Sequence, residues 1–457
     1  MKQTRRELMK MAARALPVAG AWSVAGRLTQ MSALAACAND YRALVCVFLF
    51  GGNDGNNLVV PVTTPATNPD NSYQSYARVR GGLALGQETL ELIQTQKGDT
   101  YGLHPSLKEM AELYTKKGNV AVLANTGTLV EPLTRATYQQ KTGDLPSNLF
   151  SHLDQQTAWQ TAAAQGFSAT GWGGRMADAM AECHTGKLPM LVSMSGNVLF
   201  AEGAKTNAAT VTPGQALGLQ GFGTTAAGAA RMEAVKRLME YSGGLELVKS
   251  ANAIASMGLE QAGILNDALA GSAALKTVFP ATSLGQQMQQ IARIIQVRGA
   301  LGASRQIFFA SLGGFDTHDR ELIDQASGLA AVSQAMRAFH EATVEMGVSG
   351  NVVTFTESDF GRTFQPSGGA TLGTDHAWGS HHLIMGDAVK GGDLYGKFPT
   401  LAVNGPDDAN NRGVWIPTTS LEQYGSTLAR WFGVPDEKLA QVFPNLKNFS
   451  EAGPAFL

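Results

Sequence analysis

Two apolar segments of the sequence end in acidic residues and histidines. Residues 306–312 (QIFFASL) lead to Asp316 and His318, and residues 351–356 (NVVTFT) lead to Asp359. Short apolar or β-branched runs of this kind predict buried strands. In an open parallel sheet, the carboxyl ends of the strands meet at one edge, and ligands bind there. The sequence therefore predicts an α/β fold with a functional site at that edge.

The residues around these strand ends suit a metal site. Imidazole and carboxylate are the groups that zinc and related divalent ions take as ligands. A single histidine or aspartate after a strand is usually a turn or cap residue, but several strand ends share the arrangement here. A first strand at residues 43–50 also ends in a polar turn, GGNDGNN. The candidate metal ligands are Asp54, Asp316, His318, Asp359, Asp375, His376, His381 and His382.

The rest of the chain alternates between predicted strands and helices. Such alternation predicts a doubly wound, mostly parallel sheet. Residues 203–285 differ, because they are rich in Ala and Gly and read as helices, so we expect a helical insertion or lid there. Further strands are predicted at residues 119–127 and 189–196, and helices at 102–118, 170–182, 284–297, 321–346 and 421–432.

Ser151 and His152 open a predicted helix after the second strand. The unpaired N–H groups and the dipole at a helix amino terminus favour anions and lower the pKa of a nearby hydroxyl. Ser151 is therefore the candidate nucleophile. The alternative is that Ser151 only caps the helix, which is the more frequent role of serine at such a position.

The amino terminus predicts an export signal. Arg5 and Arg6 precede an Ala-rich run at residues 11–26, which is typical of a twin-arginine signal. We expect residues 1–37 to be the signal and residues 38–457 to be the folded domain, delivered by the twin-arginine machinery to the periplasm or secreted. Small residues before Cys37 suit plain cleavage, and the alternative is a lipid anchor on Cys37.

Charge and cysteine content narrow the classes of function. The 457-residue chain has a net charge of -2, so no basic surface for nucleic acid is expected. No segment after the signal is long and apolar enough to span a membrane. Cys46 lies in an apolar run and is expected to be buried, and no structural disulfide is predicted.

Eight motifs together carry a family resemblance. They are FLFGGNDGNNLVVP, GLHPSL, SHLDQQ, GWGGR, GGFDTH, TESDFGRT, GTDHAWGSHH and KGGDLYG, in this order. The chain resembles the uncharacterised exported family known as domain of unknown function fifteen-oh-one, whose members are similar in fold to the alkaline phosphatase superfamily. The resemblance covers nearly the whole mature chain and implies a sheet of the alkaline phosphatase and sulfatase type.

The superfamily pattern also implies roles for single residues. Asp54 matches a metal-binding aspartate after the first strand, and Ser151 matches the nucleophile. Asp359 matches a further ligand, but Phe360 stands where the pattern has a histidine. The remaining positions resembling ligands are Asp316 with His318, Asp375 with His376, and His381 or His382 as the closing histidine.

The leading hypothesis is an exported, metal-dependent hydrolase of phosphate or sulfate esters. Its substrate would be a small-molecule or polysaccharide ester, and its cofactor one or two divalent ions, with zinc as the first candidate. A site with no metal is also left open. The alternative is a non-catalytic cell-envelope protein that binds a partner or polysaccharide on the same fold. A third hypothesis is a mutase or transferase of the same superfamily.

Overall fold

The computed structural model describes residues 40–63, 68, 70–215, 218–219, 222, 225–450 and 452–457. The predicted signal at residues 1–37, with Arg5, Arg6 and Cys37, lies outside the described residues. None of the helices described is long and apolar enough to cross a membrane.

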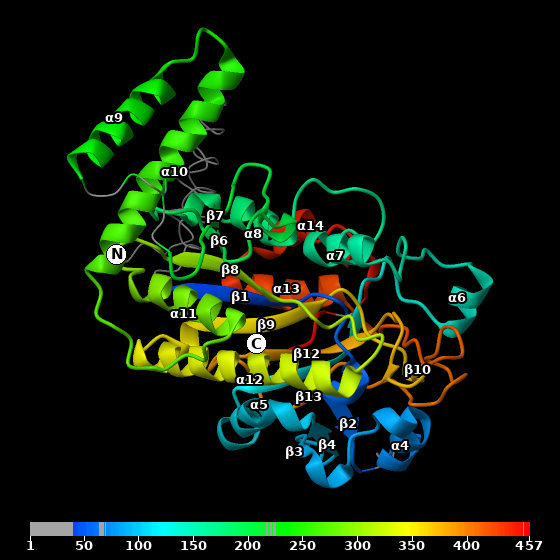
Figure 1. The fold of residues 1–457 in the computed structure, drawn as a ribbon. Helices are drawn as coiled ribbons and strands as arrows, with labels where there is room; N and C mark the ends of the chain where they lie inside the picture. Colours follow the sequence, from blue (N-terminus) through cyan, green and yellow to red (C-terminus); the bar gives the residue numbers. More distant parts are fainter. Residues whose placement is uncertain are drawn as a thin grey trace, which may run out of the picture. The chain divides into compact units, whose positions relative to one another are not determined.

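A nine-stranded sheet organises the fold (Figure 1). Its order is β13-β5-β12-β9-β1-β8-β6-β7, with β14 beside β5. Neighbouring strands pair in parallel, except that β12 runs antiparallel to both β5 and β9. The mostly parallel α/β fold is thus confirmed. The strands are β1 (Arg42–Leu49), β5 (Val120–Gly127), β6 (Leu191–Ser193), β7 (Ala209–Thr210), β8 (Arg305–Leu312), β9 (Val352–Ser358), β12 (Ser380–Met385), β13 (Leu394–Tyr395) and β14 (Thr419–Ser420).

Strand β1 lies near the middle of the sheet and contributes to cores on both of its faces. Val45 and Val47 pack into the core that includes α5 (Lys108–Glu112), α11 (Ser283–Gln296) and α12 (Glu321–Glu345). Leu44 and Phe48 pack into the core that includes α8 (Trp172–Ala179), α13 (Leu421–Phe432) and α14 (Asp436–Val442). Because side chains alternate along a strand, a strand buried on both faces reads as a continuous apolar run. Each such side chain stabilises the fold by roughly 1.5–3 kcal/mol through burial.

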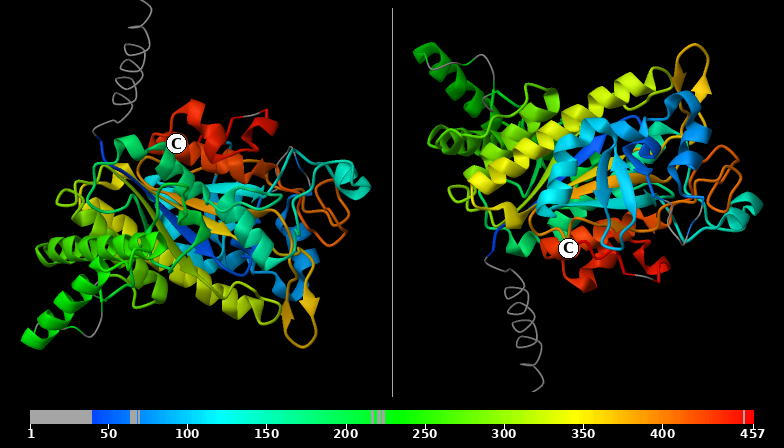
Figure 2. Two further views of the ribbon diagram at one scale, coloured as in Figure 1. Left: turned by 90° about the horizontal axis from the view of Figure 1, so that it is seen from above. Right: turned by 90° about the horizontal axis from the view of Figure 1, so that it is seen from below.

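Helices cover both faces of the sheet (Figure 2). The helix predicted at 102–118 is divided: Pro105–Leu107 form a 3-10 turn, α5 follows, and Leu113–Lys117 form a π-helical turn. The helices are α3 (Gly55–Leu58), α4 (Tyr73–Arg80), α5 (Lys108–Glu112), α6 (Arg135–Gln140), α7 (His152–Thr161), α8 (Trp172–Ala179), α9 (Ala226–Glu240), α10 (Glu246–Ala270), α11 (Ser283–Gln296), α12 (Glu321–Glu345), α13 (Leu421–Phe432) and α14 (Asp436–Val442).

Two smaller sheets and a helical pair complete the fold. The strands β2 (Val59–Pro61), β4 (Thr100–Leu103) and β3 (Glu91–Gln94) form one small sheet, and β10 (Ser367–Gly368) pairs with β11 (Leu372–Gly373). Helices α9 and α10 lie side by side, and α10 also contacts α11 (Figure 1). Both helices fall within residues 203–285, the predicted insertion.

The two cysteines that lie in the described residues behave differently. Cys46 is a free, buried thiol in β1, as expected. Cys183 is disulfide-bonded. The prediction of no structural disulfide was therefore wrong. Cys183 ends a short 3-10 turn and is half-buried, and such a position gives no sequence signal for or against pairing.

Candidate metal centre

Three histidines surround Asp316 at the carboxyl edge of the sheet. Asp316 and His318 lie in the loop after β8, His376 lies in the loop before β12, and His152 is the first residue of α7. Ligand atoms of His152, Asp316 and His376 all lie within 4.8 Å of one another. The nitrogen Nε2 of His318 lies 3.1 Å from Asp316 Oδ1, so His318 adjoins this group.

Two of these imidazoles are oriented through Nδ1. His152 Nδ1 lies 2.8 Å from Asp359 Oδ2, and His376 Nδ1 lies 2.7 Å from the carbonyl oxygen of Phe150. A carbonyl can only accept, so Nδ1 of His376 carries the proton and Nε2 keeps its lone pair. A carboxylate or carbonyl on the second ring nitrogen is the usual support of a metal-binding histidine.

The Nε2 atoms then face Asp316. Those of His152 and His376 lie 3.4 and 3.3 Å from its carboxylate oxygens. His318 follows the same pattern, since its Nδ1 lies 3.4 Å from Asp375 Oδ1. Three nitrogens and one carboxylate oxygen form a donor set that suits zinc.

The ring nitrogens of this group of histidines show whether the residues fit a divalent ion. Nε2 of His152 is buried and has no hydrogen-bond partner among the described residues. Nε2 of His318 and Nε2 of His376 lie 3.0 Å apart, a contact that needs either a proton on one of the two atoms or a cation between them. A cation among these nitrogens would satisfy all three, so the residues fit a divalent ion.

Arginines keep the carboxylates of the cluster ionised. Burial alone would raise the pKa of Asp316, but a hydrogen bond from Arg362 and its charge outweigh burial, and the pKa is lowered. Arg412 has the same effect on the pKa of Asp375. Burial lowers the pKa of His376, which favours the neutral imidazole that a metal needs.

One side of the centre is exposed to solvent, and the other side is held by hydrogen bonds to a buried carboxylate. The side chains of Asp316 and His318 are 46% and 47% exposed. Asp359, in contrast, is fully buried and accepts hydrogen bonds from Gly51 N–H and Gln156 Nε2 at 3.2 and 2.7 Å. Gly51 has a φ of 115°, and a Cβ there would lie 2.3 Å from the nitrogen of Asp316, so only glycine fits this close approach.

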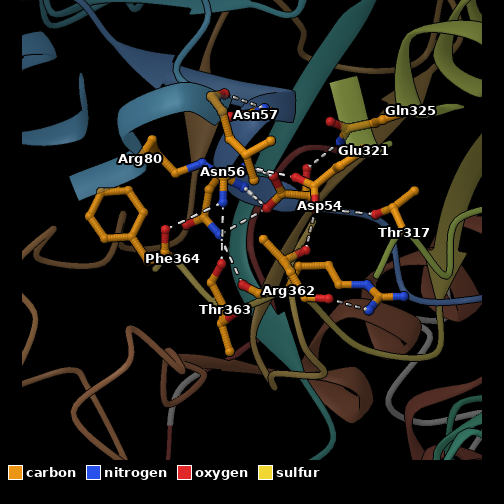
Figure 3. Close-up of polar contacts among 12 residues, drawn as sticks. Asp54, Asn56, Asn57, Arg80, Thr317, Glu321, Gln325, Arg362, Thr363 and Phe364 are labelled. Carbon is orange, nitrogen blue, oxygen red and sulfur yellow. Dashed lines mark hydrogen bonds and ion pairs between the residues drawn. The ribbon is translucent and has the colours of Figure 1, made fainter. Parts of the chain in front are cut away.

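Asp54 is not brought into the histidine cluster. It lies at the same edge, after β1, but its Oδ2 is 2.5 Å from Nη2 of Arg80 (Figure 3). The same Nη2 lies 2.7 Å from Glu321 Oε1, and all three side chains are fully buried. Burial, followed by the charge of Asp54, raises the pKa of Glu321 to about 7. We call Asp54, Arg80 and Glu321 the buried ion-pair network.

His381 and His382 are also placed apart from the cluster. Both lie in β12 and are buried. Nδ1 of His381 accepts a hydrogen bond from Asn125 N–H at 3.0 Å, whereas the ring of His382 packs beside Trp159 and Tyr424. Burial lowers the pKa of His381 to about 4 and that of His382 to about 3.

Ser151 caps α7, as its position predicts. Its hydroxyl donates to Asp154 Oδ2 at 2.5 Å and accepts a hydrogen bond from Asp154 N–H at 3.4 Å. The hydrogen bond from Ser151 lowers the pKa of Asp154. Ser151 is the residue before His152, so the capping hydroxyl lies beside the candidate centre in sequence.

The sequence of residues 41–422 matches the family described as "Protein of unknown function (DUF1501)". The chain belongs to this family. The family resemblance carried by the eight motifs is thereby confirmed. No curated protein matches the chain.

Solved structures show only distant similarity to this DUF1501 chain. Ps i-CgsB in complex with k-i-k-neocarrahexaose has 10% identity and a TM-score of 0.34, covering 90% of this chain and 77% of that one. The PsFucS1 sulfatase from Pseudoalteromonas sp. has 10% identity and a TM-score of 0.32, covering 89% and 72%. A mutant TAB5 alkaline phosphatase with Mg bound has 10% identity and a TM-score of 0.27, covering 89% and 99%. Similarities this weak establish no shared activity.

Sequence reasoning placed His152 at a helix amino terminus but did not count it among the ligands. The sequence signal that could have indicated a role for His152 was its spacing of four residues from Gln156. Residues four apart lie on one face of a helix, and both of these side chains contact Asp359. The motif SHLDQQ of this DUF1501 chain therefore contributes both a candidate ligand and part of its support.

Proposed function

We propose that this chain is an exported, metal-dependent hydrolase of phosphate or sulfate esters. The observation that carries the proposal is the arrangement of His152, His318 and His376. Each is held through Nδ1, and each directs Nε2 toward Asp316. A structural cluster of surface histidines would not need three separate supports of this kind.

His152, Asp316 and His376 would hold the ion, with His318 as an additional or alternating ligand. A bound divalent ion would polarise an ester oxygen and stabilise the negative charge that develops on it. The half-exposed side chains of Asp316 and His318 leave this position accessible to a substrate from solvent. Arg362 fixes Asp316 and also donates to the carbonyl oxygens of Gly51 and Gly52, which binds the cluster to the end of β1.

Two further features support an anionic ester. Helix α7 begins at His152, and the partial positive charge of a helix amino terminus favours phosphate and sulfate groups. Arg412, which bonds Asp375, is partly exposed beside the cluster and supplies a further positive charge. Neutral esters would gain little from either feature. A small-molecule or polysaccharide ester would fit this description.

Ser151 is the proposed nucleophile. Its observed bond to Asp154 is a capping bond, so substrate binding would have to turn Oγ away from Asp154. Attack would join Oγ to the phosphorus or sulfur atom, release the ester alcohol and leave a covalent intermediate for water to cleave. The proton of the hydroxyl would pass through solvent to the oxygen of the departing alcohol.

Export by the twin-arginine route, with residues 1–37 as the signal, belongs to the same proposal. A lipid anchor on Cys37 is the alternative to a free mature chain in the periplasm.

Elemental analysis of the natively purified protein tests the proposal. We expect about one divalent ion per chain, with its loss in a His152→Ala, His376→Ala double variant and retention in His340→Gln. His340 is a matched control because it bonds Asp387 at 2.9 Å and takes no part in the cluster. Turnover of p-nitrophenyl phosphate and p-nitrophenyl sulfate should follow the metal content.

Two results would change the conclusion. A native protein without metal, and without affinity for added zinc, would overturn the metal site. A stoichiometric metal without turnover of any ester would favour the alternative, a non-catalytic cell-envelope binding protein.

A further inference from the structure

Helices α9 and α10, with the turn between them, form a helical hairpin that the rest of the fold scarcely covers. Among the described residues of the two helices, only Gly228 and Leu265 are buried. Figure 1 shows that the pair extends away from the central sheet, with the turn at its far end. Helices in proteins are stabilised mostly by the packing of an apolar face, so helices of this length are expected to be covered.

One face of α10 has the residue spacing of a coiled-coil contact. Leu247, Ala251, Ile254 and Gly258 are separated by four, three and four residues, which places them along one line of the helix. We call these four residues the α10 seam. All four are exposed, Leu247 by 83% and Ile254 by 64%. The positions that flank the seam are uncharged as well; they are Val248, Ser250, Ala255 and Met257.

The chain's own fold does not explain the composition of this seam. Glycine in the middle of a helix is destabilising relative to alanine. A Cβ added at Gly258 would nevertheless meet nothing within 4 Å, so no contact within the described chain requires glycine there. Gly258 and Ile254 instead border a cavity of about 700 Å³. A close approach from outside the chain would account for the small residue.

We propose that the α10 seam pairs, antiparallel and about a two-fold axis, with the same seam of a second copy of this chain. In this register Leu247 of one copy lies against the partner's Gly258, and Ile254 lies against the partner's Ala251. Each large side chain then meets a small one, so the seam is complementary to itself, as a two-fold contact requires. Leu265 would lie beyond the tip of the partner's hairpin, which keeps the two sheets apart. The inference is independent of the proposed hydrolase activity.

The exposed apolar area is large enough for a stable dimer. Two paired hairpins form a four-helix bundle, whose interior takes apolar side chains from all of its helices. The exposed large apolar side chains of this hairpin are Leu238, Tyr241, Leu245, Leu247, Val248, Ile254 and Met257. At about 100 Å² each, they expose roughly 700 Å² per chain, close to the ~800 Å² that each partner buries in a stable interface.

The charges of the hairpin favour a second copy over a membrane surface. Basic and acidic residues are nearly balanced between positions 231 and 249: Arg231, Lys236, Arg237 and Lys249 stand against Glu233, Glu240 and Glu246. Attraction to anionic lipids depends on a cluster of basic residues. The hairpin has no such excess of positive charge, whereas mixed charges around an apolar seam suit contact with an identical surface.

Sedimentation of the purified full chain at micromolar concentrations tests the inference. The wild type should sediment as a dimer. Ala251→Glu should raise the dissociation constant of the dimer about 100-fold, because it places an unpaired carboxylate against the partner's Ile254. Ala253→Glu is the matched control, because Ala253 is exposed on the same helix but lies outside the seam and its flanking positions. This control should remain a dimer.

A second variant tests the register of the pairing. Ile254→Lys alone should also dissociate into monomers. Mixed with Ala251→Glu, it should form a heterodimer, because the introduced ammonium and carboxylate groups then face each other across the seam. Melting curves close to that of the wild type would show that both variants are folded.

Three outcomes would overturn the inference. One is a wild type that stays monomeric at these concentrations. Another is equal weakening by Ala251→Glu and Ala253→Glu, which would indicate a general effect of negative charge on α10. The third is a mixture of Ala251→Glu and Ile254→Lys that remains monomeric, which would exclude the proposed register.

Discussion

The histidine cluster and the buried ion-pair network occupy the same edge of the sheet but differ in what completes them. In the network, one guanidinium, that of Arg80, contacts the carboxylates of Asp54 and Glu321, and all three side chains are fully buried. In the cluster, three imidazoles surround Asp316, which is nearly half exposed. Acidic residues at this edge of the sheet therefore belong either to a buried ion-pair network or to a solvent-exposed candidate site.

The two regions are also joined. Glu321 Oε2 accepts hydrogen bonds from Thr317 and Thr374. These threonines precede His318 and Asp375 directly in the chain, so the network supports both loops that carry the cluster. The comparison teaches that an acidic residue at a strand end is not by itself a ligand. Burial and the nearest cation decide its role.

Removing the cation of the network should have the largest effect. Arg80→Met would leave Asp54 and Glu321 buried without their partner, and we expect the free energy of unfolding to fall by about 3–5 kcal/mol. Urea denaturation measures this. Arg430→Met, which breaks an exposed pair with Asp436, should cost less than about 1 kcal/mol. Equal losses in both variants would show that the network is not a closed structural element.

Removing a support of the cluster should weaken metal binding without unfolding the chain. Asp359→Asn leaves His152 in place but takes the charge from its Nδ1 partner, so zinc affinity should fall about 10- to 100-fold in competition with a chelator. Asp54→Asn should leave zinc affinity unchanged. If Asp54→Asn reduced the affinity as strongly as Asp359→Asn, the two regions would form a single site.

The buried histidine His382 should make stability depend on pH. Its pKa is lowered by burial to about 3, below the value of about 6.5 for an exposed histidine. The unfolded chain therefore binds the proton first, and stability present above pH 6.5 is lost as the pH falls. Between pH 6.5 and 5 the loss attributable to His382 should be about 2 kcal/mol.

Denaturation of metal-free protein at both pH values checks this dependence. His382→Phe should remove that part of the slope. Tyr424→Phe, which changes a neighbour of His382 that does not titrate in this range, should keep it. A slope that survives in His382→Phe would contradict the assignment.

Ser151→Ala is expected to have the smallest effect on stability, about 1 kcal/mol, because it removes a helix cap. Metal content should not change. If Ser151 is the nucleophile, nearly all ester turnover should be lost. Thr134→Ala removes the corresponding cap of α6 and should cost similar stability with no effect on turnover. Full turnover in Ser151→Ala would leave Ser151 as a cap only.

The sequence predicts the frame of the fold better than the site. Strands β1, β8 and β9 were placed within a residue or two, because strands buried on both faces are continuous apolar runs. Helix α13 was predicted with its observed ends, residues 421–432. The antiparallel strand β12 was missed, since its two histidines look like ligands in the sequence. In the structure, alternation along the strand turns one to each face of a sheet that is covered on both sides.

The site depended on long-range contacts that leave no local pattern. Four of the predicted ligands, Asp316, His318, Asp375 and His376, lie together in the structure. Arg80, however, lies in a loop-rich segment with no motif, so its pairing with Asp54 could not be foreseen. The three cluster imidazoles have different supports: two carboxylates and one backbone carbonyl. Only folding brings these groups to the rings.

The spread of the cluster along the chain has a consequence for how the protein assembles. His152 belongs to the first half of the sequence, whereas Asp316 and His376 belong to the last third, and Gly51 near the start braces Asp359. Contacts between residues so far apart form late, after the strands that separate them have found their places. A partly folded chain would have scattered imidazoles and little affinity for an ion. Capture of zinc during refolding would therefore report that the central sheet is complete.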